Sequence, residues 1–278
     1  MHAPMNPDQD VDTEVGIDEQ VGETDEVGVE GPRRRGIYLL PNLFTTAGLF
    51  AGFYAIVAAM AGHFQPAAIA VFVAMIMDGL DGRIARLTHT ESAFGKEYDS
   101  LSDMVSFGLA PALVIYEWAF KDMINFGWAW GKIGWLGAFF YAITAALRLA
   151  RFNVRSGVVD KHYFQGLPSP AAAGIVAGAV WFGVDMDIPG PALVIPAYVL
   201  TVAAGALMVS SIGYYSFKDL NLHSRVPFTT MLFLVIGLIV ISLSPPKVLF
   251  IVFFLYACSG PVMALWRLRR RVSRRQAH

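Results

Sequence analysis

The chain contains one cysteine, Cys258, and little charge, and its first 30 residues contain no lysine or arginine. A single cysteine excludes an intrachain disulfide and any zinc site built from a cluster of cysteines. Only 15% of the 278 residues are charged, whereas 55% are hydrophobic. Soluble domains of this size carry more charge, so the composition indicates a polytopic membrane protein, and we expect no nucleic-acid partner.

Charge is distributed unevenly along the chain. Residues 1–30 carry ten acids, whereas the rest of the chain holds all 21 basic residues and the other 12 acids, so its net charge is +9. The first segment also lacks aromatic residues and apolar runs. We therefore interpret residues 1–35 as a disordered acidic head that ends in a basic anchor, 36–266 as a transmembrane domain, and 267–278 as a basic tail.

Eight apolar segments approach the roughly 20 residues that a helix needs to cross the hydrocarbon core of a membrane. Pro245 and Pro246 favour a hairpin between the last two segments. The pattern predicts an all-α polytopic membrane protein with spans at 40–61, 66–86, 98–120, 131–153, 168–185, 188–208, 228–244 and 246–266.

The basic residues predict the orientation of these spans. If both termini are cytoplasmic, eighteen basic residues lie on the cytoplasmic side and only Lys121, Lys132 and Lys247 lie outside. Lysine and arginine accumulate in cytoplasmic loops, so this bias favours a protein of the cell's inner membrane with both termini in the cytoplasm.

Four aspartates lie at the edges of the second and third predicted spans. Asp78 and Asp81 are three residues apart, and Asp99 and Asp103 are four apart, so each pair shares one helix face. Ionisable residues inside a membrane mark functional sites. Four converging carboxylates require cations, and oxygen-only ligands select Mg²⁺ or Mn²⁺. Two such ions about 4 Å apart would suit displacement at phosphorus.

Small and basic residues accompany the aspartates. Gly79, Gly82 and Ala85 leave the backbone of the second span open to a flat or phosphate-bearing ligand. Arg86 follows one turn later and can hold a phosphate through two hydrogen bonds. Gly95 precedes Asp99 by one turn and would let the third span come close. A carboxylate that is not fully committed to metal can take a proton from an attacking hydroxyl.

The complete pattern resembles the signature of the CDP-alcohol phosphotransferases. It runs Asp78-x-x-Asp81-Gly82-x-x-Ala85-Arg86, then Gly95-x-x-x-Asp99-x-x-x-Asp103. The resemblance implies transfer of a phosphoryl-alcohol group from a CDP-alcohol to a second alcohol, with release of CMP and a divalent metal as cofactor. It also implies six core helices around a polar cavity that opens to the cytoplasm, with two further C-terminal helices.

Other strings resemble the integral-membrane phosphatidylserine synthase branch of that family. These are Leu40-Pro41-Asn42-Leu43-Phe44-Thr45, the stretch from Phe94 to Gly108, Arg148-Leu149-Ala150-Arg151-Phe152-Asn153 and Gly166-Leu167-Pro168-Ser169-Pro170. This resemblance implies CDP-diacylglycerol and L-serine as substrates in a membrane-bound catalytic domain, and it raises the expectation of a homodimer.

The resemblance also assigns roles to residues. Asp78, Asp81, Asp99 and Asp103 would bind two metal ions, and Asp103 would also be the general base. The head group of CDP-diacylglycerol would be bound by Gly82, Ala85, Arg86, Ser92, Gly95, Asn42 and Thr45. From charge and position we add the hypothesis that Arg148 and Arg151 bind the serine carboxylate or a phosphate, although a role as interface anchors fits them equally well.

Two alternatives remain at this point. The same transfer could use another acceptor, namely glycerol 3-phosphate, an inositol phosphate or choline, and the basic residues Arg148, Arg151 and Arg155 keep a phosphorylated acceptor open. A cation transporter would instead need acids near the middle of the bilayer that are accessible from both sides. The fourth to eighth spans carry acids only at their ends, which disfavours transport.

Overall fold

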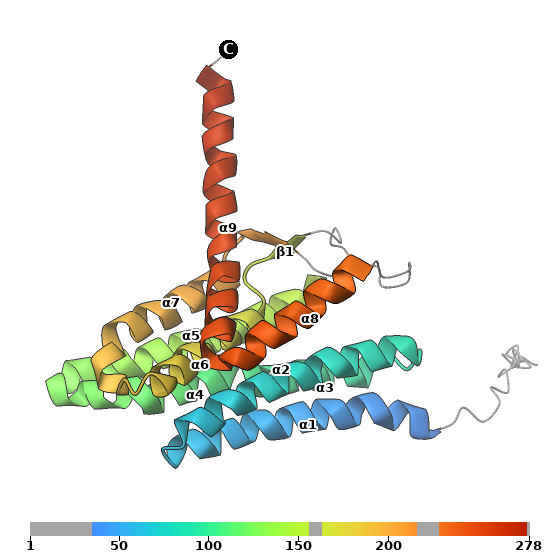
Figure 1. The fold of residues 1–278 in the computed structure, drawn as a ribbon, viewed down its shortest axis with the longest axis horizontal. Coiled ribbons are helices and arrows are strands. Elements are labelled where there is room, and N and C mark those ends of the chain that lie inside the picture. The colour runs from blue at the N-terminus through green and yellow to red at the C-terminus, as the bar shows by residue number, and fades with distance from the viewer. Residues whose placement is uncertain (1–34, 156–162, 216–227, 277–278) are drawn as a thin grey trace, which may run out of the picture. The chain divides into compact units, whose positions relative to one another are not determined.

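The computed structural model describes residues 35–155, 163–215 and 228–276, and the compact unit begins at Gly36 (Figure 1). The first two helices, α1 (Arg35–Met60) and α2 (Phe64–Leu87), are joined by only three residues. Gly62 has a φ of +78°, a left-handed conformation that glycine adopts without strain. After this tight turn α2 runs antiparallel to α1, and Asp78 and Asp81 lie near the C-terminal end of α2 (Figure 1).

The third span is an interrupted helix. It comprises α3 (Ala93–Asp103), a π-helical turn η1 (Met104–Leu109), α4 (Ala110–Ile115), a second π-helical turn η2 (Tyr116–Phe120) and the 3₁₀ turn η3 (Lys121–Phe126). The sequence predicts a start at residue 98, but the helix begins five residues earlier, at Ala93. It begins there because Ser92 caps it by accepting a hydrogen bond from the Gly95 N–H. Pro111 has no N–H for the Phe107 carbonyl, and the Tyr141 hydroxyl donates to that carbonyl instead at 3.1 Å.

The remaining helices follow the predicted spans. They are α5 (Trp128–Arg155), α6 (Ser169–Asp185), the 3₁₀ turn η4 (Gly190–Leu193), α7 (Val194–Val209), α8 (Phe228–Leu243) and α9 (Pro245–Gln276). In the described part of the chain, four helical segments are long and apolar enough to cross a membrane, and α6 is apolar but shorter. The prediction of an all-α polytopic membrane protein is confirmed.

Helix α6 lies at the centre of the packing and contacts α2, α4, α7 and α9. Small residues allow these close approaches: a Cβ atom added to Gly174 would come within 2.8 Å of the Phe253 ring, and one added to Gly178 within 3.3 Å of the Phe250 Cα. Small residues at helix interfaces are the usual means of close packing in membranes. Helix α6 therefore holds α2, which carries two of the aspartates, against the rest of the bundle.

Two features differ from the predictions. Strands β1 (Tyr163–Gln165) and β2 (Gly213–Tyr215) form a short antiparallel pair that the sequence pattern does not predict. Helix α9 continues to Gln276, ten residues past the predicted end of the last span at residue 266. The predicted acidic head lies outside the described residues.

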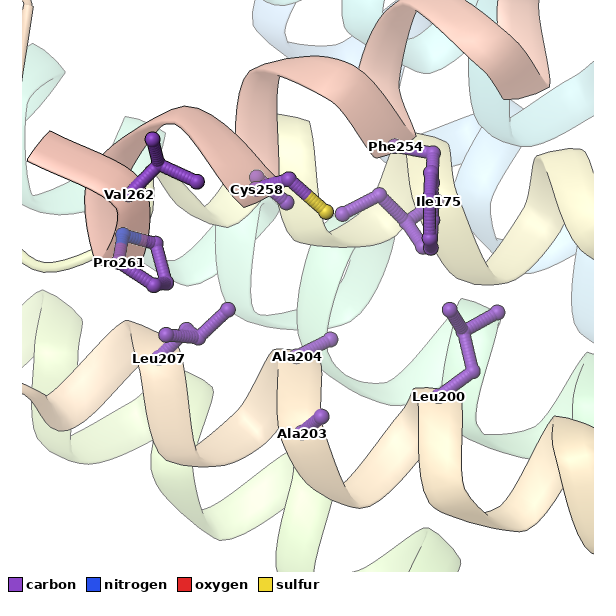
Figure 2. Close-up of a pocket in the computed structure, with 10 residues that line it drawn as sticks. Ile175, Leu200, Ala203, Ala204, Leu207, Phe254, Cys258, Pro261 and Val262 are labelled. Carbon is purple, nitrogen blue, oxygen red and sulfur yellow. The ribbon is translucent and has the colours of Figure 1, made fainter. Parts of the chain in front are cut away.

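An apolar cavity of about 240 Å³ lies between α6, α7 and α9 (Figure 2). Cys258 is among the residues that line it, and the others are Ile175, Leu200, Ala203, Ala204, Leu207, Phe254, Ala257, Pro261 and Val262. Its walls belong to helices expected at the depth of the hydrocarbon core.

Candidate metal centre

Three aspartates from two helices converge. One carboxylate oxygen each from Asp78 on α2 and from Asp99 and Asp103 on α3 lie within 4.8 Å of one another. These residues line a small cavity together with Asp81 and with residues of α1 and η1. The expectation that the acidic faces of the second and third spans meet is therefore met by the geometry.

Asp81 lies in the wall of the same cavity but outside the group of three. Its side chain is buried, and Oδ2 accepts a hydrogen bond of 2.7 Å from the Thr45 hydroxyl of α1. A carboxylate held in this way takes its orientation from the donor as well as from its own helix. The structure thus places three predicted metal ligands together and the fourth beside them, bound to α1.

The donor set fits a hard divalent cation. Like charges this close repel one another strongly in a partly buried site, so a cation between them is the simplest means of keeping all three ionised. Carboxylate oxygens are the preferred ligands of Mg²⁺ and Mn²⁺. Asp78, Asp99 and Asp103 are the residues that would hold such an ion.

The surface of α2 beside the aspartates is open, as the small residues predict. A Cβ atom added to Gly79 would meet no other atom within 4 Å, and one added to Gly82 would meet only the Arg86 side chain at 3.8 Å. Arg86 is exposed and its Nε donates to the Gly82 carbonyl at 2.8 Å. Its guanidinium group therefore lies along the helix next to Gly82, where a phosphate could reach both residues.

Asn42, Ser92 and Gly95 come together at the start of α3, although Asn42 is on α1. The Ser92 hydroxyl accepts from the Gly95 N–H at 3.0 Å. A Cβ atom on Gly95 would lie 3.1 Å from Ser92 Oγ and 3.5 Å from Asn42 Oδ1. The structure therefore groups three of the residues predicted to contact CDP-diacylglycerol, and their role in binding stays a prediction.

Arg148 and Arg151 make contacts that the substrate-binding hypothesis does not anticipate. Arg148 is buried, and its guanidinium donates to the Leu167 carbonyl and the Ser169 hydroxyl. Arg151 donates to main-chain oxygens of Gln165, Val209 and Ser210. Both arginines therefore connect α5 to neighbouring segments, Arg148 to the start of α6 and Arg151 to β1 and the end of α7. These contacts stabilise the fold.

Two serines on the acidic face of the third span make contacts that the motif does not predict. Ser102 donates to the Thr45 carbonyl at 3.2 Å, and Ser106 donates to the Gly48 carbonyl at 3.1 Å. Both serines are buried. Their spacing of four residues, matched by Gly48 and Gly52 on α1, was the available signal for a close contact between these helices.

The fold and this acidic centre define a polytopic helical membrane protein with a cluster of carboxylates suited to a divalent metal. Residues 38–263 match the CDP-alcohol phosphatidyltransferase family. The chain belongs to that family, so the resemblance seen in the motif is confirmed and the protein is a membrane-bound transferase of phospholipid biosynthesis. Membership of an enzyme family also removes the support for the transporter alternative.

Curated relatives carry closely related names. The chain is 37% identical over 198 residues to CDP-diacylglycerol–serine O-phosphatidyltransferase of Helicobacter pylori strain 26695, covering 71% of this chain and 81% of the relative. It is 38% identical over 156 residues to a protein of the same name from Mycobacterium leprae, covering 53% and 49%. Archaetidylserine synthase of Methanothermobacter thermautotrophicus is 34% identical over 177 residues, covering 63% and 69%.

Proposed function

We propose that this enzyme transfers the phosphatidyl group from CDP-diacylglycerol to the hydroxyl of L-serine, giving phosphatidylserine and CMP. The observation that carries the chemistry is the convergence of Asp78, Asp99 and Asp103 in the family's motif. Serine as the acceptor is supported by the names of the bacterial and archaeal relatives. The strings around Arg148 and Gly166 support the same choice.

In the proposed reaction Asp103 acts as the general base. It accepts the proton of the serine hydroxyl, whose oxygen then attacks the phosphorus that bears the diacylglycerol ester. A new P–O bond forms to serine, the P–O bond to the CMP phosphate breaks, and CMP leaves with both electrons of that bond. The proton on Asp103 is then lost to solvent. The serine oxygen attacks and CMP departs on opposite sides of phosphorus, so the rate depends on how the enzyme positions the two substrates.

The other site residues hold the substrates. Asp78, Asp81 and Asp99, with Asp103, would bind Mg²⁺ or Mn²⁺, and we propose two ions because four carboxylates surround the cavity. When bound, the metal neutralises negative charge on the diphosphate. Arg86 and Gly82 would contact a phosphate of CDP-diacylglycerol, and the Asn42, Ser92 and Gly95 cluster would contact the rest of its head group.

We further propose that the site faces the cytoplasm in the inner membrane. Support comes from the predicted distribution of basic residues, with eighteen on the cytoplasmic side and three outside. Asp78 precedes Arg86 by eight residues, about 12 Å along a helix, which would place the carboxylates within reach of the interface. A lipid in the bilayer and a water-soluble amino acid could both reach such a site. The resemblance alone supports a homodimer.

The deciding experiment is CMP release from CDP-diacylglycerol by the purified protein. Serine, glycerol 3-phosphate, inositol phosphate and choline are tested separately with Mn²⁺ or Mg²⁺. We expect CMP with serine alone and none after addition of EDTA. CMP with a different acceptor only would overturn serine while keeping the transfer chemistry, and no CMP with any acceptor would overturn the proposed reaction.

A further inference from the structure

Thr45 contacts both helices that carry the aspartates of the metal centre, α2 and α3, although its own helix α1 contributes no acid. Its hydroxyl has one proton, which lies between two acceptors: Asp81 Oδ2 at 2.7 Å and the Pro41 carbonyl at 3.2 Å. The shorter contact is to a carboxylate, and hydrogen bonds to charged acceptors are both shorter and stronger. Thr45 is itself buried, with 5% of its surface exposed, so water does not compete for Asp81 from this side.

The main chain of Thr45 meets the other acidic helix. Its carbonyl oxygen accepts the Ser102 hydroxyl, and Ser102 lies directly before Asp103 on α3. One turn further along α1, the Gly48 carbonyl accepts the Ser106 hydroxyl. These two bonds connect α1 to α3 and to the following turn η1, on either side of Asp103. A single turn of α1 therefore contacts both acid-bearing segments.

The helices come this close only because α1 carries a glycine. A Cβ atom added to Gly52 would lie 2.5 Å from Ser106 Oγ and 2.8 Å from Ser106 Cα. The contact therefore involves backbone as well as side chain, and it leaves α3 little freedom to slide along α1. Asp99 and Asp103 are consequently fixed relative to Thr45, and Thr45 in turn is bonded to Asp81.

We propose that Thr45 is a positioning residue for the metal centre, setting the carboxylate of Asp81 relative to Asp99 and Asp103 through its hydroxyl and its carbonyl. This inference rests on the proposed binding of a divalent metal by the aspartates. Thr45 is also predicted to contact the head group of CDP-diacylglycerol, and the two roles differ in their expected effect on Mn²⁺ binding. Loss of groups that orient ligating carboxylates lowers metal affinity about 10- to 100-fold, which sets the size of the expected effect.

The test is Mn²⁺ binding to the purified protein without substrate, followed by the electron paramagnetic resonance signal of free Mn²⁺. Thr45→Ser and Thr45→Ala are the decisive pair, because both lose the methyl group and they differ only in the hydroxyl. We expect Thr45→Ala to raise the Kd for Mn²⁺ roughly 10- to 100-fold. Thr45→Ser should bind nearly as well as the unaltered protein.

Thr201→Ala is the matched control. Thr201 is fully buried on α7, and its hydroxyl donates to the Ala197 carbonyl of its own helix, so its loss removes a buried hydroxyl away from the aspartates. Its Kd for Mn²⁺ should not change. Thermal melting of each variant in detergent shows whether a loss of affinity reflects unfolding.

The outcomes separate this inference from the proposed function. If the unaltered protein binds no Mn²⁺, the metal centre itself is overturned. If the unaltered protein binds Mn²⁺ and Thr45→Ala binds it equally well, the positioning role is overturned. A raised KM for CDP-diacylglycerol with an unchanged Kd for Mn²⁺ would assign Thr45 to substrate binding instead. Equal weakening by Ser and Ala would make the effect one of packing and would also overturn it.

Discussion

The guanidinium group of Arg148 donates to the main-chain oxygen of Leu167, nineteen residues further along the chain. The same group donates to Ser169 Oγ at 3.3 Å, so one buried side chain joins α5 to the first turn of α6. Helix α6 in turn packs against α2. Arg148 thus stabilises the packing that holds Asp78 in place. This role is structural and does not require contact with serine.

We predict that Arg148→Lys destabilises the protein without a selective effect on serine. A lysine ammonium cannot reproduce the planar fork that reaches two acceptors at once, and a buried carbonyl left unpaired costs about 1–3 kcal/mol. The melting temperature in detergent should therefore fall, while the KM for serine of the folded fraction should not change.

Lys247→Ala is a suitable control for that variant. Lys247 is exposed and lies 3.9 Å from the Asp185 carboxylate, a surface pair of small energetic value. Its melting temperature should equal that of the unaltered protein. A KM for serine raised more than tenfold in Arg148→Lys, at an unchanged melting temperature, would return Arg148 to the substrate site.

A second prediction concerns the proposed general base. Asp103→Asn keeps the size of the side chain but cannot accept the serine proton, so turnover should fall about 10²- to 10⁴-fold or more. Binding of CDP-diacylglycerol should be largely retained, as measured by equilibrium binding of the radiolabelled lipid. Asp122→Asn, in the turn η3 away from the centre, should react at the unaltered rate. Turnover near that rate in Asp103→Asn would assign the base to another residue.

A third prediction tests the contact between α1 and the π-helical turn. Gly52→Ala places a Cβ atom 2.5 Å from Ser106 Oγ, so the turn after Asp103 has to move. Overpacking of this kind costs about 1–3 kcal/mol, and we expect a lower melting temperature together with lower turnover. Gly237→Ala, on α8, meets no atom within 4 Å and should change neither quantity. An unaffected Gly52→Ala variant would show that α1 and η1 are not held tightly together.

Much of this architecture could be predicted from the sequence. Asp78, Asp99 and Asp103 are recognisable because carboxylates at helical spacing are rare in apolar segments. Each of the predicted spans overlaps helical residues of the structure, with differences of a few residues at the ends. Such features are local: they depend on periodicity within one segment, which the order of residues contains directly.

Other features depend on contacts between segments far apart in the chain. The bond from Tyr141 to the Phe107 carbonyl compensates for Pro111, and only the fold brings these residues together. The carbonyls bound by Arg151 lie fourteen to fifty-nine residues away from it. Charge and position suggested that Arg148 and Arg151 bind substrate, and that role stays a prediction beside the main-chain contacts, which only the fold reveals.

The last prediction concerns how the bundle sits in the membrane, and it uses the only cysteine of the chain. Cys258 is exposed on α9 and lines the apolar cavity between α6, α7 and α9 (Figure 2). At hydrocarbon depth its thiol should be inaccessible to a charged methanethiosulfonate reagent in intact vesicles, because ions enter the hydrocarbon core only at high cost. The uncharged reagent N-ethylmaleimide should label it only after the protein is unfolded in sodium dodecyl sulfate, because the thiolate is the nucleophile and an ion forms in hydrocarbon only at high cost.

Glu91→Cys in a Cys258→Ala background provides the matched control, since Glu91 is exposed in the turn between α2 and α3. The charged reagent should label this variant in inside-out vesicles and not in right-side-out vesicles, as a cytoplasmic site requires. Labelling in right-side-out vesicles only would invert the proposed orientation and place the aspartates on the outer face. Rapid labelling of Cys258 by the charged reagent would mean that the cavity beside α9 is filled with water, so that this part of α9 does not face lipid.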